Sequence, residues 1–131
     1  MIWLLDVSVL VAHLVQSHEH HARVAAWWPG RQFAICPITE LGFLRVACAP
    51  GFAKRDARAA LAEFLRDESP LFIPCDRHAL DGPVVQSGRK TTDIYLAELA
   101  AARGWCFATL DTGITHPAAD LIPEVAGGAP V

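Results

Sequence analysis

Residues 2–6 read Ile-Trp-Leu-Leu-Asp, a short apolar run that ends in an acidic residue. A continuous apolar run of this length is typical of a strand that is buried on both faces of a parallel sheet. Runs of the same kind recur along the chain and alternate with amphipathic stretches, which favours an α/β domain. We therefore expect a three-layer α/β/α sandwich around a central, mostly parallel sheet.

The expected strands are short and cover residues 2–5, 33–35, 71–73, 105–110 and 121–122. The expected helices cover residues 8–16, 17–28, 37–47, 54–67 and 91–103, with a short helix at 76–81 and a loop at 87–90. The turn-forming pairs Pro29-Gly30 and Pro50-Gly51 would end two of these helices. Thr91 would cap the last long helix and Gly104 would end it.

The composition is that of a folded chain with a small acidic excess. Of the 131 residues, 53% are hydrophobic and 19% are charged, which suffices for a real core. Eleven basic residues against 14 acidic residues give a net charge of −3. Such a chain is not expected to bind nucleic acid nonspecifically along its whole surface, because affinity for phosphates comes from clustered cations. An enzyme that acts on nucleic acid from a local basic patch remains compatible with this charge.

Several site types and locations are disfavoured by the sequence. No apolar run approaches the roughly 18 residues of a membrane span, and the first residues lack the pattern of a secretion signal. The four cysteines form no CxxC pair, which disfavours a zinc site. No glycine-rich loop follows the first strand, which disfavours a Rossmann or P-loop nucleotide site. We expect one cytoplasmic domain over residues 1–131 with no membrane contact.

Four acidic residues lie at strand ends or helix starts and not on the solvent-exposed faces of helices, where most surface charges are found. Asp6 and Asp111 follow expected strands, and Glu40 and Asp93 lie in the first turns of expected helices. In an open parallel sheet, ligands bind where the carboxyl ends of the strands meet the helices, and helix N-termini favour anions. We therefore expect the four carboxylates to converge on one edge of the sheet.

Converging carboxylates need a counter-charge. Two of them about 5 Å apart repel by roughly 3 kcal/mol at an effective dielectric constant of about 20, so four cannot all stay ionised alone. No lysine is adjacent in sequence to Asp6, Glu40 or Asp111. Mg²⁺ or Mn²⁺ is the simplest counter-charge for such ligands and assists phosphodiester hydrolysis. On these residues alone, scattered capping and strand-end acids in an α/β domain without a metal are an equal alternative.

Four segments resemble the motifs of PIN-domain ribonucleases, in the right order and spacing. They are residues 4–10 (Leu-Leu-Asp-Val-Ser-Val-Leu), 38–45 (Ile-Thr-Glu-Leu-Gly-Phe-Leu-Arg), 91–97 (Thr-Thr-Asp-Ile-Tyr-Leu-Ala) and 108–111 (Ala-Thr-Leu-Asp). Within that family the chain is similar to the VapC toxins of type II toxin–antitoxin modules, and the resemblance covers almost the whole chain. It implies an α/β/α fold with an acidic Mg²⁺ or Mn²⁺ site that hydrolyses RNA.

The resemblance also implies roles for single residues. The implied catalytic acids are Asp6, Glu40, Asp93 and Asp111. Three of them, Asp6, Asp93 and Asp111, would bind the metal ion. Glu40 would act through a water molecule, either on the metal or on the attacking water.

Further positions would support this site. Thr109 and Ser8 match polar positions of the family and would support the acids by hydrogen bonding. Arg89 and Lys90 would hold the RNA backbone. Thr112 departs from the family, which often has a basic or acidic residue after the last aspartate, so a second metal position stays open.

The implied function is an endoribonuclease toxin that forms a homodimer and is inhibited by a cognate antitoxin protein. Its RNA products would carry 5′-phosphate and 3′-hydroxyl ends. One alternative is a catalytically idle PIN-fold module that binds RNA or protein, which the four filled acidic positions disfavour. Another is a phosphatase or receiver-like domain with a phosphorylated aspartate, which would normally need an aspartate pair where Asp6 stands alone.

Overall fold

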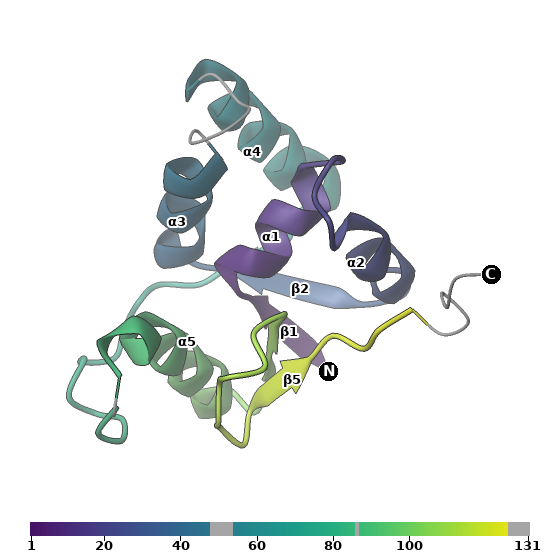
Figure 1. Ribbon diagram of the computed structural model, residues 1–131. Coiled ribbons are helices and arrows are strands. Elements are labelled where there is room, and N and C mark those ends of the chain that lie inside the picture. Colours follow the sequence, from purple (N-terminus) through teal and green to yellow (C-terminus); the bar gives the residue numbers. More distant parts are fainter. Residues whose placement is uncertain (48–53, 86, 126–131) are drawn as a thin grey trace.

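The computed structural model describes residues 1–47, 54–85 and 87–125, and this part of the chain contains five parallel strands with helices on both sides (Figure 1). The strands are β1 (Ile2–Leu5), β2 (Gln32–Ile35), β3 (Leu71–Phe72), β4 (Cys106–Thr109) and β5 (Ala119–Leu121). They lie in the order β3-β2-β1-β4-β5, and every neighbouring pair is parallel. The predicted α/β class and parallel sheet are confirmed.

The helices form two layers, one on each face of the sheet. They are α1 (Val7–Leu14), α2 (His21–Trp27), α3 (Pro37–Ala47), α4 (Lys54–Glu68) and α5 (Thr91–Ala102), with a short 3₁₀ helix, η1 (Gly88–Lys90), before α5. Side chains of α1 to α4 share one apolar core, and those of α5 belong to a second core on the other face. The predicted three-layer arrangement is therefore present.

Alternate residues of each strand explain the continuous apolar runs in the sequence. In β1, Leu5 packs in the core of α1 to α4, and Leu4 packs against α5. In β2, Ile35 and Ala34 divide between the two cores in the same way. Because both faces of the sheet are covered, neither set of side chains can be polar.

The strand order reverses between β1 and β4. From β1 the chain builds β2 and then β3 on one side, and it returns to add β4 and β5 on the other side. In sheets of this type, the crevice outside the carboxyl ends of the two strands at the reversal is where ligands bind. Asp6 follows β1 directly, and Asp111 lies two residues beyond the end of β4.

Two helix predictions are corrected by the structure. The helix expected from residue 17 begins only at His21, because the preceding residues form a turn in which the His18 ring accepts the backbone N–H of His20. The segment 76–81 is a turn and not a helix, and the Asp81 carboxylate accepts the backbone N–H of His78 there. In both places a hydrogen bond from the backbone to a side chain stabilises a turn.

The start of α5 also differs from the expectation. Residues 88–90 form the 3₁₀ helix η1 in place of a loop, and the Ser87 hydroxyl accepts the backbone N–H of Arg89 at its start. The residue at the N-cap of α5 is therefore Lys90, which makes no capping bond, and Thr91 already lies inside the helix. Gly104 follows the end of α5 with a φ of +71°, as expected of a helix-ending glycine.

Two further expectations concern the helix end near residue 50 and membrane-spanning segments. The predicted helix end at Pro50-Gly51 lies outside the described residues, as does Cys48. Within the described ranges, no helix combines the length and apolarity that crossing a membrane would require.

Two contacts fix α3 against the end of β1. The buried Thr39 hydroxyl donates to the backbone carbonyl of Leu5, at 2.8 Å, one residue before Asp6. Gly42 lies against Val7 so closely that a Cβ atom on Gly42 would overlap the Cγ2 methyl of Val7. Val7 is the first residue of α1, so the absence of a side chain at Gly42 lets α3 approach the residue that follows Asp6.

We expect Gly42→Ala to lower the free energy of unfolding by about 1–3 kcal/mol, because the stiff, branched Val7 side chain cannot move aside without shifting α1 or α3. Urea denaturation measures this change. Gly88→Ala is the matched control, since a Cβ atom there meets nothing within 4 Å. Equal stability of the two variants would contradict the close approach of the two helices.

Candidate functional site

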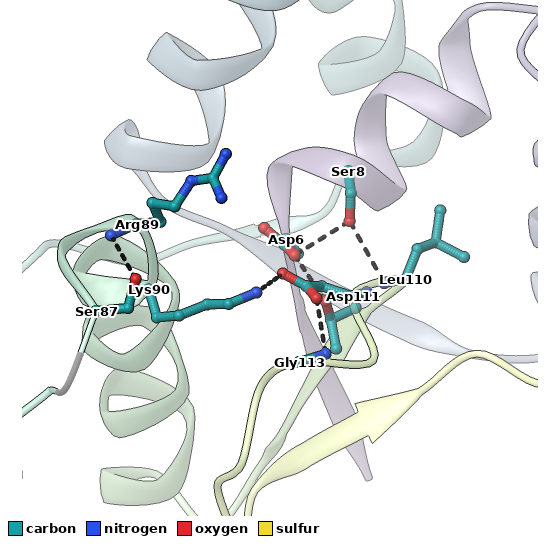
Figure 2. A network of polar contacts seen from close by, with 9 residues as sticks. Asp6, Ser8, Ser87, Arg89, Lys90, Leu110, Asp111 and Gly113 are labelled. Carbon is teal, nitrogen blue, oxygen red and sulfur yellow. Dashed lines mark hydrogen bonds and ion pairs between the residues drawn. The ribbon is translucent and has the colours of Figure 1, made fainter.

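Asp6 is a buried acid at the carboxyl end of β1. Its backbone N–H donates to the Ala108 carbonyl of β4, and its carboxylate accepts hydrogen bonds from Thr109 Oγ1 at 2.7 Å and Ser8 Oγ at 3.1 Å (Figure 2). Burial raises the pKa of Asp6, and the two hydroxyl donors lower it in part. The two hydroxyls therefore fix the orientation of this carboxylate and partly offset the loss of its hydration.

The same two hydroxyls tie the end of β1 to the loop after β4. Thr109 Oγ1 accepts the backbone N–H of Asp111 at 3.0 Å, and Ser8 Oγ accepts the backbone N–H of Leu110 at 3.4 Å. Each hydroxyl thus donates to Asp6 and accepts from the segment that carries Asp111. These contacts are the kind of support that the family resemblance implies for Ser8 and Thr109.

Asp111 is paired with a lysine that the sequence neighbourhood does not supply. Lys90 Nζ lies 2.5 Å from Asp111 Oδ2, and the backbone N–H of Gly113 donates to Oδ1 at 2.8 Å. The hydrogen bond from Lys90 is the main reason why the pKa of Asp111 is lowered. Figure 2 shows the Lys90 side chain extended from η1 to this carboxylate, with the exposed Arg89 side chain directed away from it.

Asp93 completes a group of three interacting aspartates. It lies in the first turn of α5 and is half-buried. Its pKa is raised to about 6, first by burial and then by the negative charges of Asp6 and Asp111, while Lys90 acts in the opposite direction. The ends of β1 and β4 and the start of α5 therefore bring three of the four predicted acids together.

Glu40 stands apart from these three. It lies in the first turn of α3, and its pKa is raised by burial, with no contribution from another carboxylate. Its side chain lines a depression between α3 and α4, together with Leu41 and Arg58. The structure therefore does not bring Glu40 into electrostatic contact with the aspartates.

The carboxylate oxygens of the three aspartates are suitable ligands for a hard divalent cation, although they are not arranged as a complete metal site. Within the described ranges, no three His, Cys, Asp or Glu residues are arranged so that they could hold a metal ion. Lys90 pairs with Asp111, whereas the pKa of Asp93 is raised by burial and by the negative charges of Asp6 and Asp111. Mg²⁺ commonly binds one or two carboxylates and keeps several water molecules, so a pair of carboxylates is an adequate anchor.

A family match supports this geometry. Residues 3–120 match the family model of the PIN domain, a span that includes all four acidic positions. The chain belongs to the PIN domain family. The three aspartates of this PIN domain lie just after β1, in the first turn of α5 and just after β4, and the family match covers all three positions.

Several curated relatives of this PIN domain are ribonucleases of Mycobacterium tuberculosis. Ribonuclease VapC38 (strain ATCC 25618 / H37Rv) is 36% identical over 121 residues, covering 85% of this chain and 86% of the relative. Ribonuclease VapC29 of the same strain is 33% identical over 123 residues, covering 90% of this chain and 92% of the relative. Ribonuclease VapC44 is 35% identical over 123 residues, covering 85% and 87%.

Two solved structures share the fold. VapBC2 from Rickettsia felis, bound to a DNA fragment from its promoter, aligns with a TM-score of 0.58 at 17% identity, covering 86% of this chain and 90% of that chain. FitAcB from Neisseria gonorrhoeae aligns with a TM-score of 0.56 at 22% identity, covering 86% and 89%. At these identities the likeness concerns the fold alone.

Sequence reasoning missed two features of this site. Lys90 precedes Asp93 in the sequence, yet its partner is Asp111, 21 residues further on. Thr39, next to Glu40, anchors α3 to β1 through its hydroxyl. The only signal in the sequence was the position of each residue beside an acid, which does not say where its side chain is directed.

The raised pKa of Asp93 predicts a dependence of stability on pH in the metal-free protein. Folding raises this pKa from 3.8 to about 6, so the folded state favours the protonated acid. The resulting stabilisation is complete below about pH 4 and is lost as the pH rises through about 6. The repulsion that destabilises the folded protein is therefore largest at neutral and alkaline pH.

We expect Asp93→Asn to unfold with a free energy about 1–2 kcal/mol higher than the wild type at pH 8, and the difference to vanish towards pH 4. The full pKa shift would correspond to about 3 kcal/mol, but the half-exposed side chain is screened by solvent. Urea denaturation with EDTA present measures this. Asp67→Asn, at an exposed position on α4, should show no such trend, and a wild-type pH profile in Asp93→Asn would contradict the prediction.

Proposed function

We propose that this PIN domain, taken as one domain over residues 1–131, is a metal-dependent endoribonuclease. The observation that carries the proposal is the group of three aspartates at the reversal of the sheet, in which Asp6 and Asp93 make no ion pair within the described residues and both have raised pKa values. The name Ribonuclease VapC, borne by relatives at 33–36% identity over most of the chain, supports RNA as the substrate. Family membership favours this function over a receiver-like domain, and the intact acidic group favours it over an idle module.

The metal ion is Mg²⁺ or Mn²⁺, since all the candidate ligands are carboxylate oxygens. Asp6 and Asp93 would hold it directly, and Asp111 would join them. When bound, such a cation polarises a phosphoryl oxygen, lowers the pKa of water and stabilises the leaving oxygen of a phosphodiester.

The residues of the chain prepare this site in three ways. Thr109 and Ser8 hold the Asp6 carboxylate in one orientation through hydrogen bonds. Lys90 compensates the charge of Asp111. Glu40, on the neighbouring helix, orients the attacking water from a greater distance.

Positive charge beside the acids would hold the RNA backbone in spite of the net charge of −3. Arg89 is exposed on η1, next to Lys90, and extends from the rim of the acidic group. We assign both residues to phosphate contacts, with Lys90 shared between Asp111 and the RNA.

The biological role is that of a cytoplasmic toxin of a toxin–antitoxin pair, which acts as a homodimer and is inhibited by its antitoxin. The VapC name of the relatives supports this role. Exposed apolar side chains offer surfaces for both partners, with Leu41 on α3 and Leu71 and Phe72 on the edge strand β3.

Calorimetric titration with Mn²⁺ tests the metal site. We expect saturable binding to the wild type and at least tenfold weaker binding to Asp93→Asn, a loss of about 1.4 kcal/mol. Asp67→Asn, far from the site on α4, should bind Mn²⁺ like the wild type. Equal affinity of the wild type and Asp93→Asn would refute the assignment of Asp93.

Incubation with a randomised single-stranded RNA pool tests the activity. We expect cleavage that requires Mg²⁺ or Mn²⁺, stops in EDTA and falls by at least about 100-fold in Asp6→Asn, with Glu63→Gln on α4 as the unaffected control. Sequencing of the products should find 5′-phosphate and 3′-hydroxyl ends. Ends with 2′,3′-cyclic phosphates would contradict hydrolysis by water, because they arise from attack by the ribose hydroxyl.

A further inference from the structure

A cavity of about 360 Å³ lies between α5 and the segment that leads from β3 to this helix. In Figure 1 this segment is the teal-to-green stretch of chain beside α5. The volume is within the range of pockets that hold small organic ligands. Its walls are largely apolar, with Ile38, Pro83 and Ile94 among the residues that line it.

The cavity and the acidic group share the first turn of α5. Thr92 lines the cavity, and the next residue, Asp93, interacts with Asp6. Thr92 and Ile38 also line a second hollow, which extends to Val7, the residue after Asp6. The cavity, the second hollow and the acidic group are therefore linked through the start of α5 and the residue that follows Asp6.

Arg77 lines this cavity and carries a hydrogen-bond donor without a partner among the described residues. Its Nε atom is buried and has no hydrogen-bond partner in the described part of the chain. Its backbone carbonyl accepts a hydrogen bond of 2.6 Å from the Tyr95 hydroxyl, which holds the residue against α5. A buried donor without an acceptor costs about 1–3 kcal/mol, so a rotation of the Arg77 side chain that brings Nε to an acceptor on a bound ligand would be favoured.

Building on the ribonuclease function proposed above, we propose that this cavity binds one unpaired nucleobase of the RNA, next to the phosphate that is cleaved. The apolar walls and the Tyr95 side chain would contact the ring, and Arg77 would donate to acceptor atoms on the edge of the base. Proteins recognise single-stranded RNA in this way, by packing against splayed-out bases and hydrogen-bonding their edges. The mainly apolar lining favours a base over a phosphate group, which would need several converging donors.

Titration of the metal-free, ¹⁵N-labelled protein with ribonucleoside 5′-monophosphates tests the site without cleavage. We expect amide shifts at Thr92, Tyr95 and Gly82 in NMR spectra, which ribose 5-phosphate does not produce. Arg77→Ala should weaken the binding at least fivefold, and Ala79→Trp, at an exposed position on the cavity wall, should do the same by filling it. The control Arg66→Ala, on the exposed face of α4, should bind like the wild type.

Three results would overturn the base site. The first is the absence of shifts at these amides, the second is equal shifts with ribose 5-phosphate, and the third is unchanged affinity in both cavity variants. Two variants are used because Arg77→Ala alone would also remove packing from the segment before α5. Only the loss of a base site predicts the same weakening from a deletion and from a filled cavity.

Cleavage of RNA with single abasic residues separates this inference from the nuclease function. We expect one abasic position beside the cleaved bond to slow cleavage at least tenfold in the wild type and less than twofold in Arg77→Ala. Cleavage that tolerates abasic residues at every position would overturn the base site and leave the nuclease intact. If the wild type cleaves no RNA, the nuclease proposal fails, and the nucleotide titration alone decides whether the cavity binds a base.

Discussion

The parallel pairing of β1 with β4 is the constraint on which the site depends. The pairing sets Leu5 opposite Ala108, and the backbone N–H of Asp6 continues the ladder to the Ala108 carbonyl. In this register the buried Thr109 hydroxyl meets the Asp6 carboxylate, although the two residues are 103 positions apart. A slip of one residue would turn Thr109 to the other face of the sheet and leave a buried acid without its donor.

The three aspartates carry the same chemical group in three different environments. Asp6 is buried and held by two hydroxyls, Asp111 is paired with Lys90, and Asp93 is compensated only through the charge of Lys90, without an ion pair. Burial and then the negative charges of Asp6 and Asp111 therefore raise the pKa of Asp93 to about 6. A cation bound between Asp93 and Asp6 would relieve this repulsion and would stabilise the folded chain by mass action. In the metal-free protein, ionised Asp93 therefore lowers the free energy of unfolding, and a bound cation would remove this effect.

The cationic side chains near the site reconcile an acidic chain with an RNA substrate. Lys90 and Arg89 lie on η1, and Arg77 lies on the segment before it, so one stretch of chain carries all three. This stretch packs beside α5, whose first turn contributes Asp93. Local attraction for phosphates and repulsion between the carboxylates therefore act within one region, and the net charge of the whole chain says little about either.

The sequence by itself determined the layers of the fold and the positions of the acids along it. Strands and helices leave a local pattern of apolar residues in the sequence. This pattern therefore predicted the strands, most helices and the positions of Asp6 and Asp111 at strand ends. Tertiary structure alone decided that Lys90 pairs with Asp111, that Glu40 stands apart, and that residues 76–81 form a turn beside a cavity. These features depend on how the segment before α5 docks on the helix, through contacts such as that of Tyr95 with Arg77. The direction of a side chain across such a contact has no local periodic signal, because it is set by residues distant in sequence.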